Sequence, residues 1–173
     1  MTFSRREAYD GSMQWRKLQG RFIVLDGPDG CGKSTQVGRL GEFLAAQGLD
    51  CLVVRDPGGT EIGERIRQIL LDRASTVLSV RCEMLLYMAS RAQLVHEKIR
   101  PALKQGRVIL SDRYLTSTIV YQGLAGGLDL EEIDRLYGYA CGRTWPDLVV
   151  VLDVPVEVGM SRLETGRDRM ESK

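Results

Sequence analysis

Residues 22–34 read FIVLDGPDGCGKS, so that an apolar run leads into Gly27 and the stretch ends in Gly32, Lys33 and Ser34. From Gly27 onward the stretch fits G-x-x-x-x-G-K-[ST], a loop that cradles phosphate groups when a strand precedes it and a helix follows it. Its glycines let backbone N–H groups approach phosphate oxygens, and the positive end of the following helix points at the anion. The stretch therefore predicts a nucleoside triphosphate site, with Lys33 on the β- and γ-phosphates and Ser34 on Mg²⁺.

Strands and helices alternate on both sides of this loop. Short apolar runs at 22–25, 51–54, 108–110 and 148–152 predict strands, and helical spacing predicts helices from Lys33 to Gly48 and over 62–71, 80–97 and 130–141. The run at 148–152 is expected to be a buried strand. Continuous β-branched strands between amphipathic helices indicate the α/β class, with a parallel sheet covered on both faces.

Composition limits the possible classes of protein. A chain of 173 residues with 43% hydrophobic content fits one domain, which we expect to run from 21 to 173 behind a flexible polar leader, 1–20. The net charge of +1 gives no general attraction to nucleic acid polymers or anionic membranes, and no apolar stretch is long enough to span a bilayer. Four cysteines without a C-x-x-C pair indicate reduced thiols and a cytoplasmic protein, with neither a disulfide framework nor a zinc site.

Charged residues follow each predicted strand. Asp29 lies in the loop, Arg55-Asp56 and Asp112-Arg113 follow the next two strands, and Asp153 follows the last. Ligands of open parallel sheets bind beyond the carboxyl ends of the strands, so these side chains are expected at one site. Independent helix caps are the alternative explanation, above all for Asp153.

Further motifs follow the loop in order: RDPGGT at 55–60, YMASRAQ at 87–93, SDRY at 111–114, Ser117-Thr118 and YQG at 121–123. With the loop, they resemble the thymidylate kinases, P-loop nucleoside monophosphate kinases that transfer a phosphoryl group from ATP to dTMP. The resemblance runs from about Arg21 to Lys173. Asp56 is a departure, since many members of the family carry Glu there.

The resemblance implies roles at the phosphate end of the site. Lys33, Asp112 and Arg113 would be catalytic, and Ser34 and Asp112 would hold Mg²⁺ with ATP as phosphoryl donor. Arg113 and Arg55 would hold phosphate, since a guanidinium suits paired phosphate oxygens, and Asp29 would accept the 3′-hydroxyl of the deoxyribose. The implied ATP-binding residues are Gly27, Pro28, Asp29, Gly30, Cys31, Gly32, Lys33, Ser34 and Thr35.

It also implies how the base is recognised. Tyr87 would stack on thymine, Arg91 would donate to O4, Thr118 would contact the N3 edge, Tyr121 would exclude a ribose 2′-hydroxyl, and Leu70 would lie beside the 5-methyl group. From helical spacing alone, Tyr87 and Leu70 are as readily core residues. The implied dTMP-binding residues are Asp29, Arg55, Pro57, Leu70, Tyr87, Arg91, Arg113, Ser117, Thr118, Tyr121 and Gln122.

Gly30 leaves the phosphate loop without an arginine, a feature of bacterial-type members of the family, which take catalytic arginines from a lid. The lid candidates are Arg162, Arg167 and Arg169, although a solvated helix end would look similar. The family continues beyond this lid with a last strand and helices that are absent from these 173 residues, and its members form homodimers. His96 has no second ligand at metal-binding spacing and is expected on the surface.

Two other functions remain open at this stage. One is a kinase for another pyrimidine nucleotide or deoxynucleoside on the same scaffold, against which Tyr121 and the Arg91/Thr118 pair argue. The other is a nucleotide-binding switch without turnover, against which the intact Lys33, Ser34, Asp112 and Arg113 argue.

Overall fold

The computed structural model describes residues 15–72 and 78–162. Four strands form one sheet: β1 (Phe22–Asp26), β2 (Cys51–Arg55), β3 (Val108–Asp112) and β4 (Leu148–Val151). Their order is β2-β3-β1-β4, and every neighbouring pair is parallel. The predicted parallel α/β sheet is confirmed.

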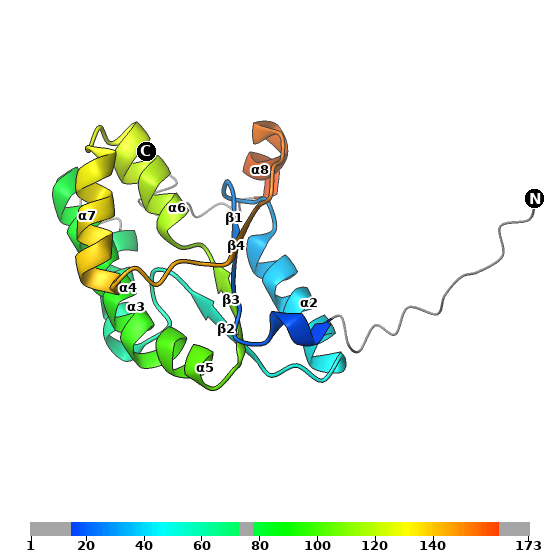
Figure 1. The fold of residues 1–173 in the computed structure, drawn as a ribbon. Coiled ribbons are helices and arrows are strands. Elements are labelled where there is room, and N and C mark those ends of the chain that lie inside the picture. The colour runs from blue at the N-terminus through cyan, green and yellow to red at the C-terminus, as the bar shows by residue number, and fades with distance from the viewer. Residues whose placement is uncertain (1–14, 73–77, 163–173) are drawn as a thin grey trace, which may run out of the picture.

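Helices cover both faces of the sheet (Figure 1). α2 (Lys33–Ala46) lies on one face, and α3 (Glu61–Leu71), α4 (Val80–Leu94), α5 (Arg100–Lys104) and α7 (Leu130–Cys141) lie on the other. Side chains of β1 alternate between the two sides, as a strand's period of two requires. Phe22 and Val24 pack in the core cluster under α4 and α7, whereas Ile23 and Leu25 pack in the cluster under α2. The remaining elements are η1 (Arg16–Leu18), η2 (Val95–Ile99), α6 (Leu115–Thr118), η3 (Ile119–Ala125) and α8 (Val156–Arg162).

The helix predicted over 80–97 runs further than expected. α4 passes into the π-helical turn η2 and then directly into α5, which ends at Lys104. Pro101 has no N–H to donate and would disturb a regular α-helix. The wider π-turn precedes Pro101, and the chain stays helical past it to Lys104.

β4 is a strand, but the prediction that it is buried was wrong. Leu148 is 52% exposed and Val151 is 61% exposed. β4 pairs with β1 on one edge, and among the residues that the structure describes no strand lies along its other edge. An apolar run thus predicts a strand, but it does not show whether other strands lie along both of its edges.

Residues 15–20 of the expected leader lie against the domain. Trp15 packs edge-on against Phe43 of α2 with 5.2 Å between ring centroids, and the Gly20 N–H donates to the Gly106 carbonyl over 2.9 Å. Residues 1–14 of the leader, and the lid candidates Arg167 and Arg169, fall outside the described residues. Within the described part of the chain, no helix combines the length and apolarity needed to cross a membrane.

Candidate active site

Strand register brings the predicted polar residues to one edge of the sheet. Arg55 at the end of β2 is level with Asp112 at the end of β3, and Asp112 is level with Leu25 of β1, just before Asp26. A cavity of about 700 Å³ opens at this edge, between the phosphate loop and the helices α4, α6 and η3. The predicted residues that line it are Asp29, Gly30, Cys31, Gly32, Lys33, Ser34, Thr35, Arg55, Pro57, Tyr87, Arg91, Asp112, Arg113, Ser117, Thr118, Tyr121, Gln122 and Arg162.

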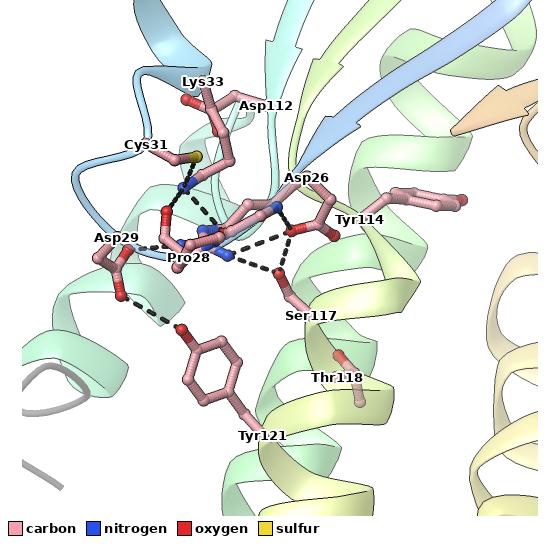
Figure 2. Close-up of polar contacts among 12 residues, drawn as sticks. Asp26, Pro28, Asp29, Cys31, Lys33, Asp112, Tyr114, Ser117, Thr118 and Tyr121 are labelled. Carbon is pink, nitrogen blue, oxygen red and sulfur yellow. Dashed lines mark hydrogen bonds and ion pairs between the residues drawn. The ribbon is translucent and has the colours of Figure 1, made fainter. Parts of the chain in front are cut away.

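Lys33 folds back over the phosphate loop. Its Nζ donates to the carbonyl oxygens of Gly27 at 3.1 Å and Pro28 at 2.7 Å, and lies 3.6 Å from the Cys31 sulfur (Figure 2). Gly27 and Pro28 themselves are not among the lining residues. Their carbonyl oxygens hold the lysine side chain in place, and its buried ammonium group lies at the wall of the cavity.

Ser34, at the start of α2, donates its hydroxyl to the Asp112 carboxylate at the end of β3. The two predicted metal ligands are therefore in contact. In the described residues, no group of three or more His, Cys, Asp or Glu side chains is arranged to hold a metal. Two protein oxygens suit Mg²⁺, which usually takes one or two protein oxygens and completes its shell with phosphate oxygens and water.

Arg113 lies in an ion cluster with Asp29 of the loop and Asp26 of β1. Its guanidinium pairs with Asp29, contacts Asp26 at 3.3 Å and donates to Ser117 at 2.9 Å. Its φ of +66° is in the left-handed region, a strained conformation for a side chain larger than glycine. Two hydrogen bonds hold it there: its N–H donates to the Leu25 carbonyl, and its carbonyl accepts from the Ser111 hydroxyl.

Asp26 is a site residue that the sequence analysis missed. It is buried, its Oδ1 accepts from Gly27 N–H and Ser117, and no described residue supplies a hydrogen bond to its Oδ2. The signal that would have found it is its place at the carboxyl end of β1, the same position that singled out Asp112 in β3.

Tyr121 lies at the part of the cavity that Asp29 and Arg113 line. Its hydroxyl donates to Asp29 Oδ2 over 3.2 Å, and its ring lies 5.9 Å from the Arg113 guanidinium carbon. Partial burial is the largest cause that raises the pKa of Tyr121, and the negative charge of Asp29 is the second. The hydroxyl therefore keeps its proton and acts as a donor.

Arg91 of α4 forms a buried ion pair with Asp56, which directly follows β2. Their side chains are 1% and 0% exposed, and 2.5 Å separates Arg91 Nε from Asp56 Oδ2. Burial raises the pKa of the Asp56 carboxyl, and Arg91 acts against this shift. Burial acts to lower the pKa of Arg91, but Asp56 outweighs it, so the guanidinium stays charged.

The remaining contacts of Arg91 lead to the predicted base-reading residues. Its Nη2 donates to Thr118 Oγ1 over 3.0 Å and to the Tyr114 carbonyl over 3.3 Å. The guanidinium and the Thr118 hydroxyl thus share one wall of the cavity. Nearby, the buried Gln122 amide donates to Glu83 over 3.4 Å.

Besides Gly27 and Pro28, two more predicted positions do not line the cavity. Leu70 is fully buried, and its neighbour Leu71 lines the cavity instead. Successive helical residues are about 100° apart, so only one of the pair faces a given side of α3. Asp153 is exposed and is not among the lining residues. His96 is exposed, as predicted. Asp56, which follows β2 and was expected at the site, also lines the cavity, and further lining residues that the sequence analysis missed are Gln36, Arg67 and Tyr114.

Arg55 lines the cavity while paired with Glu64 of α3 at 2.6 Å. Glu64 also accepts from the Gly59 N–H at 2.7 Å. Its hydrogen bond with Arg55 is the largest influence on the pKa of Glu64 and lowers it. Arg162 of α8 approaches the phosphate loop from the other side, with Nη1 donating to the Gly30 carbonyl over 3.2 Å.

Comparison with known proteins agrees with this geometry. The family model for thymidylate kinase matches residues 25–173. The chain belongs to the thymidylate kinase family. It is 46% identical to a thymidylate kinase of Caldanaerobacter subterraneus subsp. tengcongensis over 90% of this chain and 75% of the relative, and 45% identical to one of Ectopseudomonas mendocina over the same shares. The crystal structure of thymidylate kinase from Ehrlichia chaffeensis superposes with a TM-score of 0.73 at 32% identity, covering 83% of this chain and 78% of that one.

The superposition confirms the P-loop nucleoside monophosphate kinase fold.

Proposed function

We propose that this cavity binds ATP and dTMP and transfers the γ-phosphoryl group of ATP to dTMP, giving ADP and dTDP. The observation that carries the proposal is that one cavity joins a phosphate loop to a buried guanidinium–hydroxyl pair, Arg91 and Thr118. The loop suits the donor phosphates, and the pair suits the acceptors and donors at a pyrimidine edge.

The donor end uses the loop and Lys33. In this arrangement the lysine charge is satisfied by two backbone carbonyls, Gly27 and Pro28, which are weaker partners than an anion. Phosphate oxygens compete for the same N–H donors and draw Lys33 toward the β- and γ-phosphates. Phosphoryl transfer then depends on two anions held in line with their charge neutralised, more than on covalent help from the protein.

The acceptor end uses Arg113 and Asp29. These two side chains pair with each other here, so the dTMP phosphate replaces Asp29 as the partner of Arg113. The released Asp29 carboxylate then accepts the 3′-hydroxyl of the sugar, while Tyr121 lies beside C2′ and excludes a ribose hydroxyl. Arg55 supplies a second cation near the acceptor phosphate after parting from Glu64.

Mg²⁺ would be held by the Ser34 hydroxyl and the Asp112 carboxylate, whose contact supports this assignment. When bound, the ion neutralises phosphate charge in the transfer. Asp112 also lies level with Arg55 across the sheet edge. Because a phosphate monoester is already a nucleophile at neutral pH, Asp112 is needed to organise the site and not to remove a proton.

Arg162 would be the cation that meets charge developing in the transfer, since Gly30 gives the loop none beyond Lys33. Its contact with the Gly30 carbonyl supports this role. The family resemblance extends the same role to Arg167 and Arg169.

A coupled ADP-release assay with a panel of nucleoside monophosphates tests the proposal. We expect dTMP to be the preferred acceptor, with CMP, ribo-UMP and purine monophosphates turned over far more slowly. If another pyrimidine nucleotide or a deoxynucleoside is the preferred acceptor, that compound replaces dTMP as the proposed substrate. ATP binding without acceptor-dependent ADP release would indicate a switch and contradict the proposal.

We also infer a cytoplasmic homodimer. All four cysteines are free, which supports a reducing compartment. The contacting elements α4 and η3 expose Leu85 at 53%, Val120 at 45% and Leu124 at 69%, which supports an apolar interface. Light scattering of the purified protein tests the assembly.

A further inference from the structure

The phosphate loop and α8 meet through two glycines. A Cβ added to Gly30 would lie 2.1 Å from the carbonyl oxygen of Gly159, and a Cβ added to Gly159 would lie 2.8 Å from the carbonyl oxygen of Asp29. Both distances are shorter than the 3.0 Å that real Cβ atoms keep. The two backbones therefore lie directly against each other, and neither position has room for a side chain.

Gly30 and Gly159 require glycine for different physical reasons. Gly30 has a φ of +74°, which disfavours any side chain regardless of space. Gly159 lies inside α8, where helix propensity favours alanine over glycine. At position 159, therefore, the local backbone does not require glycine, and the close approach to the loop does.

This contact brings an arginine to the loop. Arg162 comes three residues after Gly159, so the two lie on neighbouring positions of the same helix face. Its Nη1 donates to the Gly30 carbonyl over 3.2 Å, and its side chain lines the cavity. Figure 1 shows α8 beside the loop that joins β1 to α2.

We propose that Gly159 is a positioning residue for phosphoryl transfer: it lets α8 lie on the phosphate loop and so holds Arg162 at the phosphate end of the cavity. The inference rests on the proposed function, in which Arg162 meets the developing charge. It also explains why the loop carries no arginine of its own, because a side chain at position 30 and the docked α8 exclude each other.

A methyl group at position 159 would push α8 off the loop. Ordinary contact begins at 3.4 Å, so the 2.8 Å approach to the Asp29 carbonyl must open by about 0.6 Å. The loop is held by the Lys33 contacts to Gly27 and Pro28, whereas α8 is a short helix with mostly exposed side chains. The displacement therefore falls on α8 and Arg162. Because a misplacement of about 1 Å costs on the order of 10²-fold in rate, we expect about a tenfold fall in kcat.

The test compares Gly159→Ala with Gly38→Ala in the full-length protein. Gly38 is also inside a helix, α2, and a Cβ there meets nothing within 4 Å. We expect the tenfold fall in kcat for Gly159→Ala alone, with the dTMP dissociation constant unchanged by calorimetry and the melting temperature not lowered. Gly159→Ser adds the same Cβ and should show the same fall in kcat as Gly159→Ala.

A double-mutant cycle separates positioning from a general structural effect. In an Arg162→Ala background, Gly159→Ala should lower kcat by less than about twofold, because its effect passes through the missing arginine. The same loss in both backgrounds would mean that the methyl group disturbs the loop itself, and would overturn the inference.

The outcomes distinguish this inference from the proposed function. ADP release that does not depend on dTMP contradicts the proposed function. A dTMP-dependent enzyme in which Arg162→Ala lowers kcat but Gly159→Ala and Gly159→Ser do not overturns only the role of Gly159. If Arg162→Ala keeps the kcat of the parent, Arg162 has no role in catalysis, and the inference about Gly159 is overturned as well.

Discussion

Replacing Arg91 with glutamine should affect stability and substrate binding together, and the two effects can be separated. Arg91 and Asp56 are paired with side chains 1% and 0% exposed, and no described residue donates a hydrogen bond to Asp56 Oδ1. Arg91→Gln would leave the Asp56 carboxylate buried without its charge partner. Breaking a buried pair from one side costs about 3–5 kcal/mol of unfolding free energy.

For a chain of this length the loss corresponds to a fall in melting temperature of about 6–20 °C, measurable by calorimetry or circular dichroism. The matched control is the double variant Asp56→Asn with Arg91→Gln, in which both charges are removed. We expect it to regain most of the lost stability, because a neutral amide pair is far cheaper to bury than an unpaired carboxylate.

Binding should not recover in that double variant. Without the guanidinium the base edge loses its donor, and dTMP affinity should fall by about 1–3 kcal/mol, or roughly 5- to 150-fold, by titration calorimetry. Arg91→Gln with unfolding free energy within about 1 kcal/mol of the parent would refute the reasoning about the buried pair. A double variant that binds dTMP like the parent would remove Arg91 from base recognition.

Three further outcomes are expected. Lys33→Ala should abolish ADP release while calorimetry shows dTMP affinity largely unchanged, because Lys33 contacts the donor end only; an equal loss of dTMP affinity would contradict this assignment. Tyr121→Ala should raise kcat/KM for ribothymidine monophosphate relative to dTMP by about tenfold, whereas Tyr121→Phe keeps the ring and should not change that ratio. Burial raises the pKa of Cys141 to about 11 from 9.0, so at pH values between these two the unfolded chain loses this proton and the folded chain keeps it. Stability is therefore lost as pH rises, and urea unfolding at about pH 8 and about pH 10.5 should show the parent losing about 1–2 kcal/mol more than Cys141→Ala; equal losses would count against a buried thiol.

Local sequence was sufficient for most of the elements and for much of the site. The phosphate loop, the helix over 130–141 and the strands were predictable because periodicity, glycine placement and apolar runs are properties of neighbouring residues. The motif residues of α4 and of the segment after β3 were also predictable, and the structure places them around one cavity.

Other features were missed because they depend on partners distant in the chain. The helical segment 115–125, formed by α6 and η3, has no clear amphipathic period, and packing against α4 and α7 supports it. Leu70 and Leu71 look alike in the sequence, and only the rotation of α3 decides which of them faces the cavity. Exposure of β4 depends on which strand lies beside it.

The sequence by itself determined the class of fold, the phosphate loop and the family, because each is recognised from short motifs and periodic segments whose residues are neighbours in the chain. Tertiary structure alone decided which charged and polar groups are joined. Asp56 meets Arg91 across 35 positions, Asp29 meets Arg113 across 84, and Gly30 meets Arg162 across 132. Such pairs form where strand register and helix packing bring chain segments together, and at buried positions a charge without its partner would be too costly to keep.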